Sequence, residues 1–310
     1  MKSHVKLNLV RYLFISLALA LSIGCADPAF TDKTQMTRSL LRAENVPANS
    51  AFAKKVVLVA QRIEIKNKDI SMFGLCTGVV VGPRSVLTAA HCLKNGTARM
   101  KIILNINPRS ELADDEKDIY SVIDSFVHPG YQSVDRELLT LEELKQNPDL
   151  ALLYVDRNLD NFEPVTVLPD FQNYIKDLDM LDVTMAGYGK TTALKDTSRI
   201  AITELNGVLK KATVQVPTAA LTQSYFSLNQ QKSAGICHGD SGAPLFLEVR
   251  DKSYLFALAV GVYRINKLVE DQQKKILLSD CSEYGMYINL YDHQLWLQQA
   301  LKELPTRNQL

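Results

Sequence analysis

Short runs of β-branched and other apolar residues recur along most of the chain, and turn-forming residues separate one run from the next. The pair Gly82-Pro83, for example, stands between two such runs. Many short apolar segments with turn signals between them are typical of β-sandwiches and β-barrels, so the sequence predicts an all-β fold. The expected strands lie at 56–60, 77–81, 85–88, 100–106, 120–123, 150–155, 183–186, 207–214, 244–249 and 254–262.

The size and charge of the chain narrow the classes of function. Its 310 residues are enough for one large β domain or for two smaller ones. The 35 basic and 34 acidic side chains give a formal net charge of +1. A nucleic-acid-binding protein is expected to carry a basic patch or stripe, so this balance argues against a nucleic-acid partner. Hydrophobic residues make up 46% of the chain, which is ordinary for a folded domain and argues against global disorder.

The first 25 residues have the pattern of an export signal. Basic residues precede the apolar run 12–23, which is too short to span a bilayer as a helix. Two endings fit: residues 22–25 resemble a bacterial lipoprotein box with Cys25 as the lipidated residue, whereas the small residues at 24–26 fit a cleavage site that releases the protein. We expect export across the inner membrane, to the periplasm, the outer membrane or the medium. A lipid on Cys25 is the one expected membrane contact.

Three short strings carry candidate chemistry. Residues 87–92 read Leu-Thr-Ala-Ala-His-Cys, residues 147–153 read Asn-Pro-Asp-Leu-Ala-Leu-Leu, and residues 237–244 read Cys-His-Gly-Asp-Ser-Gly-Ala-Pro. A serine hydroxyl becomes a strong nucleophile when a neighbouring imidazole takes its proton. The imidazole needs a carboxylate on its other nitrogen, which fixes its tautomer and stabilises the imidazolium. Taken singly, the histidine also fits a packed or surface residue, and Gly-Asp-Ser-Gly also fits an ordinary turn.

Together and in this order, the strings resemble the catalytic signatures of the trypsin/chymotrypsin-like serine peptidases, as in a bacterial, exported member. The likeness covers about residues 52 to 302. It implies two six-stranded antiparallel β-barrels, with the active site in the cleft between them, and a C-terminal α-helix. The expected parts are a signal peptide at 1–25, a pro-segment or linker at 26–50 and a peptidase domain at 51–304, with barrel 1 at about 52–165, barrel 2 at about 175–290 and the helix at about 291–304.

The resemblance implies a catalytic triad of His91, Asp149 and Ser241. The apolar run after Asp149 is a buried-strand signal, which puts its carboxylate at the start of a strand. The main-chain N–H groups of Gly239 and Ser241 are expected to form the oxyanion hole, because the small Gly239 lets the backbone turn both groups toward one point.

The five cysteines fit an exported protein. Cys25 belongs to the signal region, and the resemblance pairs Cys76 with Cys92 and Cys237 with Cys281. Spacing alone leaves three pairings of these four residues open. No Cys-x-x-Cys or histidine-rich spacing occurs, so we expect neither a metal site nor a cofactor. Disulfide bonds persist in oxidising compartments, in agreement with the export signal.

The expected specificity pocket has no acid at its floor. Trypsin-like members carry an aspartate six residues before the nucleophile, where this chain has Gly235. Gly285 is expected to form one wall, and the registers 258–262 and 260–264 both fit the opposite wall. In neither register does the family's usual serine that supports the catalytic aspartate appear. We expect a preference for apolar or medium-sized residues before the cut, unless Asp280 supplies the missing charge.

Asp240, next to the expected nucleophile, is the expected activation partner. In the family, a newly cut N-terminus pairs with this carboxylate and orders the oxyanion loop. A buried carboxylate without a partner costs several kcal/mol, so some group must meet it. The best match to the family's first mature residues is 40–43, so cleavage after Ser39 would release residues 27–39. Alternatively no cut occurs, and a side chain such as His238 meets the carboxylate.

The sequence therefore predicts a monomeric, exported serine endopeptidase that cuts protein or peptide substrates through an acyl-enzyme. The alternative is a catalytically weak or inactive double barrel that serves as a binding or regulatory module. The charged segment 132–146 is an insertion before the expected catalytic aspartate. It is interpreted as a solvated loop helix or as an element that controls substrate access.

Overall fold

By its internal contacts the chain divides into two parts, residues 1–36 and 37–310. All the residues that the structure describes belong to 37–310. The expected signal peptide with Cys25, most of the expected pro-segment, part of the insertion and Asp280 lie outside the described residues. The computed structural model describes residues 40, 42–47, 49–64, 71–103, 118–134, 141–169, 171–189, 208–250, 252–265, 276–278, 281 and 283–308.

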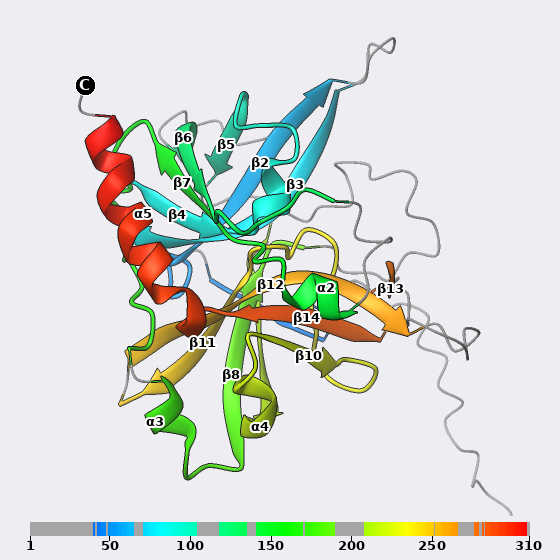
Figure 1. Ribbon diagram of the computed structural model, residues 1–310. Coiled ribbons are helices and arrows are strands. Elements are labelled where there is room, and N and C mark those ends of the chain that lie inside the picture. Colours follow the sequence, from blue (N-terminus) through cyan, green and yellow to red (C-terminus); the bar gives the residue numbers. More distant parts are fainter. Residues whose placement is uncertain are drawn as a thin grey trace, which may run out of the picture. The chain divides into compact units, whose positions relative to one another are not determined.

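Strands dominate these residues, as predicted, and the longest helix closes the chain (Figure 1). The elements are, in chain order, β1 (Glu44–Asn45), β2 (Val56–Glu64), β3 (Ser71–Gly82), β4 (Ser85–Thr88), the 3₁₀ turn η1 (Ala90–Leu93), β5 (Met100–Ile103), β6 (Ile119–Val127), α2 (Leu141–Lys145), β7 (Ala151–Val155), α3 (Phe171–Ile175), β8 (Met180–Gly187), β9 (Lys210–Pro217), α4 (Thr218–Leu221), β10 (Tyr225–Asn229), β11 (Pro244–Val249), β12 (Lys252–Ile265), β13 (Ile276–Leu278), β14 (Tyr284–Asn289), the 3₁₀ turn η5 (Tyr291–His293) and α5 (Gln294–Arg307).

Strands β2 to β7 form a closed antiparallel barrel in the order β2-β3-β4-β7-β6-β5. The apolar residues of β2 explain how the barrel uses both of its faces, because successive side chains of a strand point to opposite faces. Val57 and Val59 pack inside the barrel, whereas Val56 and Leu58 belong to a core that also contains residues of β11, β12 and α5. The barrel is therefore filled on its inside and covered on its outside.

The second half forms another six-stranded antiparallel unit, in the order β9-β8-β11-β12-β14-β10. Strand β1 extends it at β9, and β13 pairs with β12. Among the described residues no ladder joins β9 to β10, so this unit is a half-barrel. Strand β10 was not among the strands predicted from apolar runs. The prediction of an all-β fold with a C-terminal helix is confirmed.

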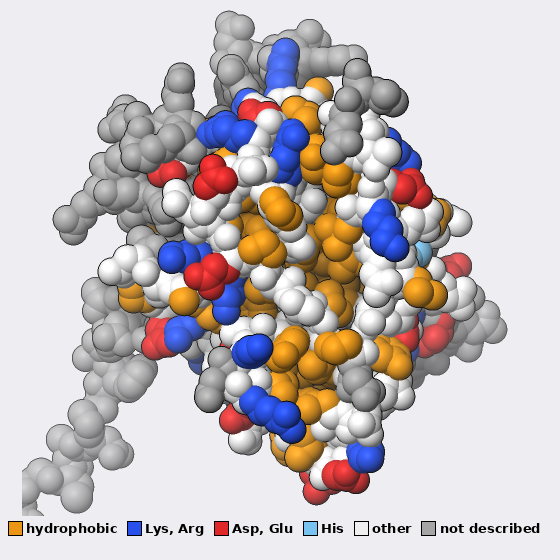
Figure 2. All heavy atoms as spheres, turned by 90° about the vertical axis from the view of Figure 1, so that its left-hand side faces the viewer, with side chains coloured by type: hydrophobic (Ala, Val, Ile, Leu, Met, Phe, Trp, Pro, Cys, Tyr) orange, Lys and Arg blue, Asp and Glu red, His pale blue; other side chains and the backbone are white. Residues whose placement is uncertain are grey.

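Helix α5 packs against the core between the two β-units through four side chains. The buried residues are Trp296, Leu297, Ala300 and Leu304. Leu295 is apolar but 83% exposed. It lies two residues from the buried Leu297, and residues two apart are separated by about 200° around a helix. Figure 2 shows the α5 side of the molecule, where a band of hydrophobic side chains reaches the surface. Within the described residues no helix is long and apolar enough to cross a membrane.

Candidate active site

His91 and Asp149 form a two-point contact at the first barrel. His91 lies in η1, the turn directly after β4, and Asp149 stands two residues before β7. Nδ1 of His91 lies 2.8 Å from Oδ2 of Asp149, and the main-chain N–H of His91 donates to Oδ1 at 2.8 Å. The carboxylate is buried, whereas the imidazole side chain is 27% exposed. This geometry keeps Nδ1 on the carboxylate and leaves Nε2 as the nitrogen for proton transfer.

Tyr225 of β10 ties the main chain on both sides of this aspartate to the second β-unit. Its hydroxyl accepts the N–H of Asp149 at 3.0 Å and donates to the carbonyl oxygen of Asn147 at 2.5 Å. The tyrosine is buried, so water competes little for these bonds. No sequence pattern marks this residue, because the short strand that carries it has no distinctive alternation.

Two glycines shape the loop that carries Ser241. Gly239 has φ +97° and Gly242 has φ +82°, in the region that favours glycine. A Cβ on Gly242 would lie 2.2 Å from the carbonyl oxygen of Thr77, so no other residue fits there. Thr77 of β3 holds the loop this close to the first barrel. The main-chain N–H of Thr77 donates to the carbonyl of Ser241 at 2.8 Å, and the hydroxyl of Thr77 donates to the carbonyl of Gly239 at 3.0 Å.

Cys92 connects the serine loop with the histidine turn. Its sulfur lies 4.0 Å from the carbonyl oxygen of Ser241 and 4.0 Å from Nε2 of His91. The structure therefore brings His91, Asp149 and Ser241 to one place, where the first barrel meets the second unit.

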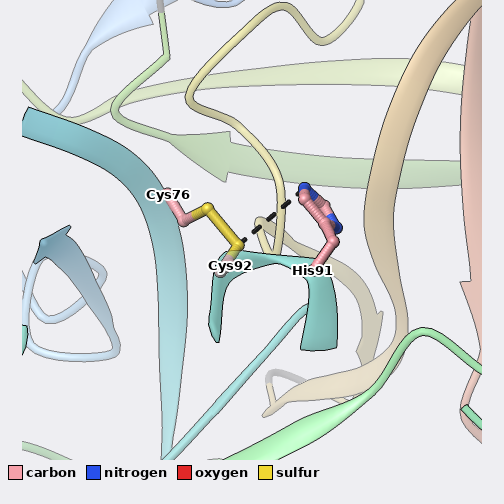
Figure 3. A group of neighbouring side chains, drawn as sticks. All are labelled: Cys76, His91 and Cys92. Carbon is pink, nitrogen blue, oxygen red and sulfur yellow. Dashed lines mark hydrogen bonds between the residues drawn. A yellow bond between two sulfur atoms is a disulfide. The ribbon is translucent and has the colours of Figure 1, made fainter. Parts of the chain in front are cut away.

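Two disulfide bonds brace this place. Cys76 is joined to Cys92, and Cys237 is joined to Cys281, the pairs that the resemblance implied. Figure 3 shows His91 beside the first of these bonds. Cys76, Cys92 and His91 have the atom types of a metal site within 4.8 Å of one another. However, both sulfur atoms are committed to the disulfide, so these residues do not fit a metal ion.

The expected pocket residues Gly235 and Gly285 face the same buried side chain, that of Gln230. A Cβ on Gly235 would lie 2.2 Å from Oε1 of Gln230, and one on Gly285 would lie 2.9 Å from it. The amide of Gln230 accepts the N–H of Ile236 and donates to two carbonyl groups, so it is fixed in place. The hydroxyl of Tyr287 lies 2.7 Å from the Cβ position of Gly285 and has no hydrogen-bond partner among the described residues. The polar groups next to these two glycines are therefore a neutral amide and a hydroxyl.

Strand β12 pairs with β14 beside Gly285. Gly285 pairs with Val262, and the following Met286 pairs with Gly261. Val260 lies at the irregularity between Ala259 and Gly261. The paired residues run from Ala257 to Tyr263, so this ladder includes residues of both expected registers.

Asp240 is fully buried behind the serine. Its carboxylate accepts the N–H of Gly189 at 2.8 Å and the N–H of Cys237 at 2.9 Å. Burial raises the pKa of Asp240 to about 7, while these two donors and the charge of Lys210 act in the opposite direction. Lys210 is itself buried and was not among the candidate site residues. A lysine at an inward-facing strand position would have been the signal.

The chain around the expected cleavage point packs against the second β-unit. Leu40 is fully buried in the same core cluster as Cys237 and Ala243. The guanidinium of Arg42 donates to the carbonyl groups of Gln231 and Ser233 at 3.0 and 2.8 Å. This segment therefore docks beside the loop that leads to the serine in the continuous chain.

The side chain of His128 contacts η5 and α5. Its Nε2 lies 3.3 Å from Nδ1 of His293, and its ring packs 5.0 Å from that of Trp296. Burial lowers the pKa of both histidines, that of His293 to about 4, where the neighbouring imidazole acts in the same direction. Through these contacts His128 packs the first barrel against the C-terminal helix.

Comparison with known protein families identifies the family of this chain. Residues 60–279, well over half of the chain, match the family model described as Trypsin. The chain belongs to the trypsin family. This trypsin-family chain is 28% identical to serine protease Hayan of Drosophila melanogaster over 60% of its length, 27% identical to CLIP domain-containing serine protease B4 of Anopheles gambiae over 62%, and 26% identical to human kallikrein-8 over 55%. The matches span 30%, 56% and 62% of those three proteins. Because these relatives are from insects and human, they do not support a bacterial origin.

Proposed function

We propose that this protein is a serine endopeptidase in which Ser241 attacks the scissile carbonyl of a peptide. The contact of His91 with Asp149 supports this assignment most strongly. It presents Nε2 as the base that takes the hydroxyl proton, and it stabilises the imidazolium that forms. The same imidazole returns the proton to the leaving amine, and water then releases the acyl group by the reverse sequence.

The oxyanion of the tetrahedral intermediate is assigned to the N–H groups of Gly239 and Ser241. The positive φ of Gly239 supports this role, because it allows successive N–H groups to turn toward one point. Removal of one such donor costs about 3 kcal/mol of transition-state stabilisation in a serine peptidase.

The pocket assigned to Gly235 and Gly285 favours apolar or medium-sized side chains over Lys and Arg. A basic side chain needs a buried carboxylate, and Gln230 and Tyr287 offer a neutral amide and a hydroxyl instead. The two disulfides support export of the protein. The lipid on Cys25, the bacterial compartment, the monomeric state, the domain boundaries and the release of residues 27–39 belong to the same proposal and rest on the sequence patterns alone.

A fluorophosphonate probe tests the proposal directly, because it reacts with an activated serine in an ordered oxyanion hole. Purified protein is expected to be labelled at Ser241 and to hydrolyse peptides. The variant Ser241→Ala should lose both activities and keep the melting temperature. Ser253→Ala is a matched control, since that hydroxyl is bonded to Glu248 on the exposed hairpin between β11 and β12. A folded, unlabelled wild-type chain would favour the binding or regulatory module.

A further inference from the structure

The carboxylate of Asp240 is fully enclosed in the protein. Its oxygens accept N–H groups from Gly189 and Cys237, which stabilise the charge but carry none themselves. A Cβ on Gly187 would lie 2.1 Å from Oδ1, and one on Gly189 would lie 2.3 Å from Cγ. These two glycines thus bring the end of β8 against the carboxylate. A buried carboxylate that stays ionised needs a cation nearby.

Lys210 stands across the ladder from the glycine that touches this carboxylate. Gly187 and Lys210 are directly paired residues of β8 and β9, and such pairs point to the same face of a sheet. Because a side chain on Gly187 would point at the carboxylate, the side chain of Lys210 extends on that face as well. Lys210 is only 5% exposed, and its charge lowers the pKa of Asp240. Lysine is almost never this buried unless it is paired.

The next lysine shows the opposite orientation. Lys211 places its amino group 3.2 Å from a carboxylate oxygen of Glu44, and its side chain is 38% exposed. Of the two adjacent lysines, Lys210 is therefore the buried one on the face of the Asp240 carboxylate, and Lys211 forms an ordinary surface ion pair.

We propose that the ε-ammonium of Lys210 meets the carboxylate of Asp240 and thereby holds the loop 237–241 with its oxyanion donors in place. Lys210 is then a positioning residue, which acts through Asp240 and touches no substrate. The inference rests on the proposed function and extends it to regulation: the continuous chain is already ordered for catalysis, and cleavage after Ser39 is not required. The rival cation is a new α-amino group at Leu40, which is buried in the same unit.

A double-mutant cycle on the full chain tests the pairing without any use of activity. The free energy of unfolding is measured for wild type, Lys210→Met, Asp240→Asn and the double variant. If the two charges interact, the effects are non-additive, and we expect a coupling of at least tenfold in the unfolding equilibrium constant, which is about 1.4 kcal/mol. Lys211→Met, the same change one residue along the strand, should be additive with Asp240→Asn.

Labelling by a fluorophosphonate probe tests the consequence for the serine loop. The chain is kept continuous across residues 39–40, as checked by mass spectrometry. Wild type and Lys211→Met should react at the same rate, whereas Lys210→Met should react at least 100-fold more slowly. Loss of labelling together with the tenfold coupling supports the proposal.

Other outcomes overturn it. Additive free energies exclude the pairing, even where labelling of wild type upholds the peptidase. A wild-type chain that reacts only after cleavage at residue 39 assigns the role to the new terminus. If Lys210→Met folds only together with Asp240→Asn, the pairing is supported. If it stays unfolded in both backgrounds, the side chain serves packing and the proposal fails. An unlabelled wild type contradicts the peptidase function, while the cycle still decides the pairing.

Discussion

The hydroxyl of Tyr225 is expected to control both the stability and the turnover of this protein, and Tyr225→Phe removes that single atom. The ring fills a buried position between the β-units, so the phenylalanine keeps the packing. The N–H of Asp149 loses this acceptor inside the protein, whereas the carbonyl of Asn147 is close enough to the surface to find water. A buried donor that loses its partner costs about 1–3 kcal/mol. For a domain of this size that lowers the melting temperature by roughly 2–6 °C.

The activity of Tyr225→Phe should fall through kcat. The tyrosine fixes the main chain that carries the Asp149 carboxylate, and this carboxylate orients the imidazole of His91 from two sides. A looser aspartate affects the chemical steps and not the binding of the peptide, so KM should stay within twofold. We expect kcat to fall about tenfold, equivalent to about 1.4 kcal/mol of barrier. Steady-state kinetics on one good peptide separates the two constants.

Tyr263→Phe is the matched control for this experiment. Tyr263 also donates from its hydroxyl, to Ser227 at 2.8 Å, and its strand belongs to the same unit. Its loss should lower the stability slightly and leave kcat unchanged. If Tyr225→Phe melts at a lower temperature but turns over at the wild-type rate, the tyrosine only stabilises the fold. If neither quantity changes, the reasoning from its two hydrogen bonds is wrong.

Three further outcomes are expected. Burial holds the pKa of His293 near 4, below its value of about 6.5 in the unfolded chain, so the unfolded chain binds more protons between these pH values. The free energy of unfolding, measured in urea, should therefore fall as the pH drops from about 6.5 to 4, by up to about 1.4 kcal/mol per pKa unit. The variant His293→Gln should flatten this dependence. Gly235→Asp alone should not create cleavage after Lys or Arg in a peptide library, because its Cβ meets Gln230, whereas Gly235→Asp with Gln230→Ala should. Replacing both Cys76 and Cys92 by Ser opens a link across 16 residues and should cost about 3 kcal/mol in urea unfolding, and a stability equal to wild type would contradict it.

The strands that carry apolar runs could be predicted from the sequence, because burial on one or both faces leaves a pattern. Strand β7 is buried along its whole length and was predicted within one residue. Strand β10 was missed, since its alternation is weak and two polar residues interrupt it. Apolar residue type alone does not identify the buried face of α5, because Leu295 is apolar but faces water.

The sequence positions of His91, Asp149 and Ser241 could be selected because the motif strings are local. The groups that hold them could not. Tyr225 is 76 residues from Asp149, and Lys210 is 30 residues from Asp240, so no local pattern reports either relation. Gln230 likewise comes to lie beside Gly235 only when the loop before Cys237 folds back on it.

These contacts share a feature that links the fold to the chemistry. Tyr225 reaches from the second unit to the aspartate loop of the first barrel, and Thr77 reaches from the first barrel to the serine loop of the second unit. Each unit therefore holds the reactive loop of the other by hydrogen bonds to main-chain groups. Hydrogen bonds to main-chain groups constrain where the bonded residue lies and not which side chain it carries. They therefore hold His91 and Ser241 near each other without leaving a local sequence motif. Any change that lets the two units separate should weaken both loops at once, and a loss of catalysis is then expected before global unfolding.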